Sequence, residues 1–220
     1  EEACEAREKP YHPVSPLAAA QLLRGAAELF DQEPNVVPVT IPAGGKLTVV
    51  GDLHGGLGDL LHILRTRGMP RDEHAAGEAS GGACAHFFLF NGDLVDRGAH
   101  GLEVTLLLAL LKLAHPRAVF CNRGNHEDVA VNAIYNFAGE IVRKCGAGRA
   151  ANGVQAAVAA LWRSLPLAHV VNKRVLVLHG MVPFHGVGTE AWRSPTLAEI
   201  DALDRHAFVK SVDVTAAQPD

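Results

Sequence analysis

The sequence predicts an α/β protein in which strands alternate with helices and the helices cover the faces of the sheet. Short apolar runs rich in Val, Leu and Phe alternate with longer segments of helical periodicity along most of the chain. Several of these apolar runs stop abruptly at a Gly-Asp or His-Gly pair. With 220 residues, 48% of them hydrophobic, the chain is long enough to bury one sizeable core.

The first part of the chain begins with a helix signal. Ser15 can accept a hydrogen bond from a free backbone N–H and Pro16 suits a first turn, so we expect a helix that continues to Phe30. Two β-rich runs follow, separated by a Gly-Gly turn, and the second covers residues 46–50. Residues 57–68 are amphipathic and end at a glycine, which predicts the next helix.

The rest of the chain repeats the order of strand and helix. Residues 71–86 are rich in Gly and Ala and lack periodicity, so we expect them to form a surface insertion. Apolar runs and helical periodicity then define the remaining elements. These are a strand over 87–90, a helix over 101–114, a strand over 117–122, helices over 129–144 and 154–164, and a strand from Lys173 that ends on His179 and Gly180.

Composition argues against several functional classes. A net charge of −4 and a pI of about 6.3 give no basic surface for nucleic acid, so we expect no nucleic-acid partner. No apolar run reaches the length of a membrane span, and the charged first residues do not resemble a signal peptide. The four cysteines include no CxxC pair, which favours a reducing compartment. We expect a cytoplasmic location and leave a nuclear one open; because the chain opens with Glu, lost flanks could carry targeting signals.

Four of the predicted strands release a metal-capable residue at the carboxyl end, where α/β sheets gather their active sites. Carboxylates and imidazoles from several strand ends can hold two divalent ions if one carboxylate bridges them, and such a pair suits attack on phosphorus. We assign Asp93 as the bridge. Neighbouring glycines would allow the sharp turns and close backbone approach that the ligands need. The four tips carry Asp52 with His54, Asp93 with Asp96, Asn125 with His126, and His179.

His126 receives a separate role, because it and the adjacent Asn125 would not easily reach one ion. Cleavage of a phosphate ester needs a proton for the leaving alkoxide, and a histidine oriented by a carboxylate can supply it. We therefore assign His126 as the general acid and Asp96 as its partner. Arg97 offers a planar guanidinium for phosphate oxygens.

Each of these features has a simpler explanation when taken alone. A Gly-Asp pair after a strand is more often a turn than a ligand, an isolated His179 is more often a packed histidine, and Asp96 with Arg97 could form a surface ion pair. Arg123 is as consistent with a structural role as with phosphate binding and is left out of the site. The joint occurrence of "GDLHG", "GDLVDRG", "RGNHE" and "LHG" in this order favours an active site.

At these residues the sequence resembles the phosphoprotein phosphatase (PPP) family of serine/threonine phosphatases, within the calcineurin-like metallophosphoesterase fold. The motifs "GDLHG", "GDLVDRG" and "RGNHE" carry the likeness, which spans about residues 34–206. The resemblance implies a β-sandwich flanked by helices, with a helical extension over residues 1–33 and the catalytic domain over 34–220. It also implies two divalent metal ions, with manganese, iron or zinc left open. The implied roles are Asp52, His54 and Asp93 at the first metal; Asp93, Asn125 and His179 at the second; His126 and Asp96 in proton transfer; and Arg97 and Asn125 on the substrate phosphate.

A finer likeness points to the EF-hand-containing, retinal-degeneration-C type branch of that family. It rests on "EPNVV", "FNGDLVDRG", "NRGNHED", "LPLA" and the run "N..Y.F..E...K" from Asn132 to Lys144. No Asp-rich EF-hand calcium loop occurs in the sequence, so any calcium-binding regulatory region or subunit is expected outside this segment.

Two departures from the family pattern affect the expectation. Met181 stands where the family usually has a second glycine after His179. The family also supplies a further metal-binding His and a phosphate-binding Arg from a later region, so we expect the domain to lack C-terminal strands and part of its second metal site.

The resemblance implies a phosphatase that hydrolyses phosphoserine and phosphothreonine in proteins by direct attack of metal-bound hydroxide. Two alternatives stay open at this point. The chain could be a catalytically impaired, truncated homologue that acts as a binding module, or a metallophosphoesterase that acts on nucleotides.

Overall fold

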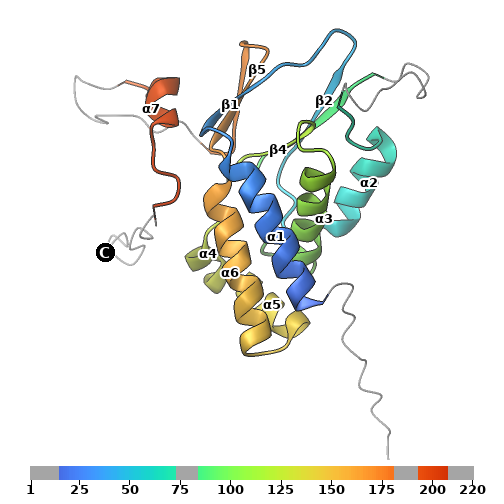
Figure 1. Cartoon of the computed structure of the whole chain (residues 1–220), viewed down its shortest axis with the longest axis vertical. Helices are drawn as coiled ribbons and strands as arrows, with labels where there is room; N and C mark the ends of the chain where they lie inside the picture. The colour runs from blue at the N-terminus through green and yellow to red at the C-terminus, as the bar shows by residue number, and fades with distance from the viewer. Residues whose placement is uncertain (1–14, 73–83, 181–192, 208–220) are drawn as a thin grey trace, which may run out of the picture.

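Two three-stranded sheets and a group of helices make up residues 15–72, 84–180 and 193–207, which are the part of the chain that the computed structural model describes (Figure 1). The strands are β1 Val36–Val39, β2 Lys46–Val50, β3 His86–Phe90, β4 Val119–Cys121, β5 Ala168–Val171 and β6 Val175–Leu178. The helices are α1 Pro16–Asp31, α2 Leu57–Arg67, α3 Gly101–Ala114, α4 Val129–Ile134, α5 Phe137–Cys145, α6 Arg149–Ser164 and α7 Leu197–Asp201. The predicted α/β architecture is confirmed.

The two sheets differ in strand direction. In the sheet β2-β3-β4 all strands run parallel, with Val50 opposite Phe90 and Phe90 opposite Cys121, so the three carboxyl ends lie side by side. In the sheet β1-β5-β6 the strand β5 is parallel to β1 and antiparallel to β6. The first sheet therefore has the one-sided arrangement of loops that a site at strand ends requires.

Alternation along β3 creates two hydrophobic cores. Phe88 and Phe90 are fully buried in the core that the helices share with this sheet. Phe87 and Leu89 point the other way, into a second core that includes Val37 and Val39 of β1. Because successive side chains of a strand point to opposite faces, one strand can join the helical layer to the second sheet. The result is a two-sheet sandwich with helices on one outer face.

Helix α1 belongs to the same core as the site-bearing sheet. Ser15 caps it by accepting a hydrogen bond from the Ala18 N–H, as its sequence predicts. The buried side chains Leu23 and Phe30 share the core with α3 and α6, and Figure 1 shows α1 beside both of these helices. The domain boundary expected between residues 33 and 34 stays a prediction. Helix α1, which precedes that boundary, packs into the same hydrophobic core as the helices that follow it.

Three sequence-based expectations were wrong in detail. The single helix expected over 129–144 is two helices, α4 and α5, separated at Asn136, whose backbone is left-handed (φ 74°). Helix α6 begins at Arg149 rather than Val154. The short elements β5 and α7 were not expected, since a run of four or five residues carries little periodicity.

Among the helices of the described residues, none has both the length and the apolar character that crossing a bilayer requires. Of the expected surface insertion, residues 73–83 lie outside the part of the chain described here, as does Met181. The expected lack of C-terminal strands also concerns residues beyond that part.

Candidate metal centre and acid pair

Loops from four strands meet at one edge of the sandwich. Three of them follow β2, β3 and β4 of the parallel sheet, and the fourth follows β6 of the other sheet. Two groups of side chains offer ligand atoms that all lie within 4.8 Å of one another. The first group is His54, Asp93 and His126, and the second is Asp52, Asp93 and His179.

Asp93 is common to both groups, and its two oxygens face different partners. Its Oδ2 lies 3.6 Å from Nε2 of His54. Its Oδ1 lies 3.3 Å from Nε2 of His179. A carboxylate with one oxygen toward each of two donor sets has the geometry expected of a bridging ligand.

The other oxygen donors lie on either side of this carboxylate. Oδ2 of Asp52 lies 3.8 Å from Nε2 of His54, and its Oδ1 lies 4.0 Å from Nδ1 of His179, so Asp52 is within reach of both histidines. Oδ1 of Asn125 lies 3.1 Å from Nε2 of His179. The structure thus brings the five predicted metal ligands together.

Each of the three imidazoles of the site is oriented by a hydrogen bond at its Nδ1. Nδ1 of His54 is 2.9 Å from the Val95 carbonyl oxygen, and Nδ1 of His179 is 2.6 Å from the Asn91 carbonyl oxygen. A carbonyl oxygen only accepts, so each Nδ1 carries the proton and each Nε2 is free to bind a metal. Nδ1 of His126 is likewise bound, 2.8 Å from Oδ2 of Asp96.

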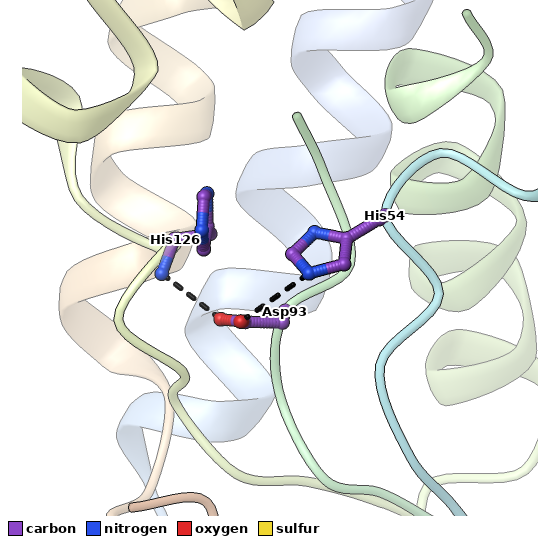
Figure 2. A group of neighbouring side chains, drawn as sticks. All are labelled: His54, Asp93 and His126. Atoms are coloured by element: carbon purple, nitrogen blue, oxygen red, sulfur yellow. Dashed lines mark hydrogen bonds and ion pairs between the residues drawn. The ribbon is translucent and has the colours of Figure 1, made fainter. Parts of the chain in front are cut away.

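His126 and Asp96 form a buried pair beside the centre. Their side chains are 2% and 0% exposed. Figure 2 shows His54 and His126 on either side of Asp93, and the backbone N–H of His126 donates to Oδ1 of Asp93 at 3.0 Å. Because Asp96 occupies Nδ1, only Nε2 of His126 can face a substrate or an ion. The pair has the arrangement predicted for a general acid and its orienting carboxylate.

Arg97 lies apart from the ligand cluster. It is exposed and lines an open cavity together with Asp96 and Tyr135. Within the described residues no hydrogen bond or ion pair engages its guanidinium, so phosphate contact by Arg97 stays a prediction. Phosphate contact by Asn125, whose Oδ1 lies 3.1 Å from Nε2 of His179, also stays a prediction.

Backbone strain concentrates at the site. His54, Asp93, Asp96 and Arg97 all adopt positive φ values, between 42° and 67°. Left-handed backbone is unfavourable for side chains with a Cβ and persists where surrounding contacts impose it. The loop after β3 therefore stores conformational energy in the residues that present the site.

Two glycines make the approach of the loops possible. A Cβ on Gly92 would lie 2.6 Å from the Gly124 backbone, and one on Gly124 would lie 2.4 Å from Oδ1 of Asp93. The close approach expected at the glycines beside the ligands is not found at Gly51 or Gly180. A Cβ at either position would meet nothing within 4 Å among the described residues.

Sequence reasoning missed Glu127, which joins two of the loops. Its carboxylate accepts hydrogen bonds from the backbone N–H groups of Asp93 at 2.7 Å, Leu94 at 2.9 Å and Gly124 at 2.8 Å. Burial raises the pKa of Glu127 to about 7, and these hydrogen bonds oppose the rise. The Glu that follows the "RGNH" letters was a signal that could have been used, since a buried Glu needs partners.

The donor set fits a pair of divalent cations. Two carboxylates, two imidazoles and an amide oxygen supply the mixed oxygen and nitrogen ligands that manganese, iron and zinc accept. The Nδ1 hydrogen bonds provide the outer contacts that orient histidine ligands in metal sites.

Comparison with known proteins agrees with this geometry. A family model described as calcineurin-like phosphoesterase matches residues 45–217. The chain is 43% identical over 174 residues to the serine/threonine-protein phosphatase rdgC of Drosophila melanogaster, which covers 79% of this chain and 24% of that protein. It is 35% identical to the mouse serine/threonine-protein phosphatase with EF-hands 2, over 82% of this chain and 21% of that protein.

A solved structure gives the same result in three dimensions. A Saccharomyces cerevisiae protein serine/threonine phosphatase, described as similar to human phosphatase PP5, superposes with a TM-score of 0.74 and 34% sequence identity. The match covers 88% of this chain and 55% of that one. The chain thus spans a fraction of the length of the relatives that it matches.

Proposed function

The chain belongs to the calcineurin-like phosphoesterase family, and on that premise we propose that it acts as a metal-dependent protein serine/threonine phosphatase. The reaction is hydrolysis of a phosphate monoester on a serine or threonine side chain. The similar proteins named rdgC and phosphatase with EF-hands 2 support this class of substrate.

One observation carries the proposal: the two oxygens of Asp93 face two separate sets of donors, at 3.6 Å and 3.3 Å. We assign His54 to one set and Asn125 with His179 to the other. Asp52 lies within reach of both histidines, and we assign it to the set of His54. Divalent ions at such paired sites activate water for attack on phosphorus and withdraw charge from the phosphate oxygens. The protein holds these donors in place, and the hydrogen bonds at Nδ1 of His54 and His179 leave the Nε2 of each ring to bind a metal.

The leaving oxygen needs a proton, which His126 is placed to give. Asp96 accepts a hydrogen bond from Nδ1–H of His126 at 2.8 Å, which leaves Nε2 as the nitrogen for proton transfer. Nε2 of His126 then donates to the serine or threonine oxygen as the bond to phosphorus breaks. Arg97, exposed beside this pair, is our proposed contact to the phosphate oxygens.

Regulation and location extend the proposal. The similar phosphatase with EF-hands 2 motivates a calcium-binding regulatory region or subunit outside this segment.

The cysteines Cys84, Cys121 and Cys145 have free thiols, which supports our proposal of a reducing, cytoplasmic location.

The test measures bound metal and hydrolysis together. The purified chain is loaded with manganese, the metal per chain is counted, and turnover is followed on a phosphoserine peptide, on phenyl phosphate and on a dinucleoside polyphosphate. Two ions per chain with preference for the peptide support the proposal. One ion without hydrolysis of either monoester would support a binding module, and preference for the dinucleotide would support a nucleotide-directed enzyme.

A further inference from the structure

The buried amide of Asn132, on α4, contacts both members of the acid pair. Its Nδ2 donates to Oδ2 of Asp96 at 2.9 Å and to the backbone oxygen of His126 at 2.7 Å. The side chain is 3% exposed and contacts neither the metal ligands' donor atoms nor the open cavity beside Arg97. Its two N–H groups are thus committed to the pair formed by Asp96 and His126.

Trp162, on α6, fixes which way this amide points. Its indole Nε1 donates to Oδ1 of Asn132 at 2.9 Å. An indole N–H can only donate, so the Asn132 atom facing it must be the oxygen, and the amide nitrogen must face Asp96. Trp162 is 1% exposed and packed in the core with Phe137, so the reference point for the amide is rigid.

Without these contacts the carboxylate of Asp96 would have fewer constraints. Oδ2 receives His126 and Asn132, and Oδ1 receives the backbone N–H of Phe137 at 3.2 Å. Asp96 sits on a strained backbone with φ 67°, which does not by itself hold a side chain in one rotamer. Three donors from two helices and a loop therefore determine where the carboxylate, and with it the His126 ring, can lie.

The helices α4 and α5 pack along the loop after β3, which carries Asp96. Four residues of these helices, and Tyr135 in the turn between them, contact the loop after β3, its following helix or His126. They are Asn132 to Asp96, the Tyr135 ring 4.9 Å from the His126 ring, the Phe137 N–H to Asp96, the Glu140 carboxylate to the N–H groups of Gly101 and Leu102, and Lys144 to the Ala99 oxygen.

We propose that Asn132, oriented by Trp162, is the positioning residue that aligns the Asp96–His126 pair for proton transfer to the leaving oxygen. The proposal rests on the proposed phosphatase function. Asn132 touches no reacting atom, and its effect passes through the direction in which Nε2 of His126 points. Trp162 extends the unit to α6, a helix that brings no residue of its own to the metal centre.

The first experiment measures the geometry of the Asp96–His126 pair independently of catalysis. In the metal-free chain, the low-field proton resonance of the His126 Nδ1–H is identified by its loss in His126→Asn. We expect Asn132→Ala to broaden this resonance or move it upfield, because the carboxylate that accepts the proton gains freedom. Trp162→Phe keeps the ring packing, removes only the indole N–H and should have a smaller effect of the same kind. Asn152→Ala, at an exposed position of α6, is the matched control and should leave the resonance unchanged.

The second experiment measures proton donation by comparing two substrates whose leaving groups differ in their need for a proton. In the manganese-loaded chain we expect Asn132→Ala to lower kcat on phenyl phosphate roughly tenfold or more, the scale of a general acid that is misplaced rather than lost. The loss on 2,4-dinitrophenyl phosphate should be several times smaller, because that leaving group departs without a proton. KM and the metal count should stay unchanged.

Several outcomes would overturn the assignment. An unchanged Nδ1–H resonance in both Asn132→Ala and Trp162→Phe would show that the pair is positioned without them, and equal kcat losses on both esters would indicate general damage. If Asn132→Ala does not fold, Trp162→Phe decides by the same two readouts. A chain that hydrolyses neither ester before substitution contradicts the proposed function, whereas the resonance still tests the positioning role.

Discussion

Gly124 and Asp93 lie so close together that a Cβ on Gly124 would be 2.4 Å from both the backbone nitrogen and Oδ1 of Asp93. The two loops that carry Asp93, the proposed bridging carboxylate, and His126, the proposed acid, are therefore packed backbone to backbone, without a side chain between them.

Replacing Gly124 by Ala should displace Asp93 and weaken metal binding by roughly 10- to 100-fold, the usual cost of disturbing the contacts that orient metal ligands. Calorimetric titration of the metal-free protein with manganese measures the change. Gly51→Ala is the matched control, because Gly51 also precedes a ligand but has open space where the Cβ would lie. Equal affinities in the two variants would show that the loops can separate at no cost.

Asp93→Asn should abolish turnover and weaken both metals. The two oxygens of Asp93 face His54 at 3.6 Å and His179 at 3.3 Å. The Asn amide keeps only one oxygen, so on one of these two sides an NH2 group replaces the metal-binding oxygen. Metal per chain, counted after gel filtration, should fall from two toward zero rather than to one. Retention of one tightly bound ion would mean that Asp93 serves a single site.

His126→Asn should spare metal binding and slow the chemical step by roughly 10²-fold or more. The reason is that Nδ1 is already committed to Asp96 at 2.8 Å, while Nε2 is reserved for proton transfer. Single-turnover rates and the metal count separate the two effects, with His62→Asn on the exposed face of α2 as control. Since His126 also lies near His54 and Asp93, loss of metal in this variant would reassign it as a ligand.

His169 should make the fold less stable in acid. It is buried between the two sheets, and burial lowers its pKa to about 3. An unfolded chain binds a proton there near pH 6.5, whereas the folded chain does not until about pH 3. The unfolded state therefore holds more protons in that window, and the free energy of unfolding falls by up to about 1.4 kcal/mol for each unit of pH lost.

Urea unfolding at several pH values checks this window. In His169→Gln the amide can still donate to Oδ1 of Asn122, which accepts from Nδ1 of His169 at 2.7 Å, but it does not titrate. The fall of stability between pH 6.5 and 3 should be shallower in this variant than in the exposed control His62→Gln. Parallel curves for the two variants would show that His169 is not held neutral by the fold.

Local patterns in the sequence were enough to predict most elements and the candidate ligands. The apolar run of β3 followed by "NGDLVDRG" predicts a buried strand with a polar tip, and the structure has both. The helix over 129–144 failed for a tertiary reason. At Phe137 the backbone N–H turns to Oδ1 of Asp96, and the chain passes through left-handed Asn136 instead of continuing the helix. Helical periodicity on both sides of the break concealed it.

The sequence by itself determined which residues stand at the strand ends, because alternation and turn glycines act over a few residues. Only the tertiary structure decided that His179 meets Asp93. Strand β6 belongs to the other sheet, and it reaches the centre because Asn91 and Asn122 donate to the backbone oxygens of Leu178 and Val177 across the sandwich. The orientation of Asn132 by Trp162 was decided in the same way. Contacts between distant segments depend on how whole layers pack, and no short pattern along the chain encodes that packing.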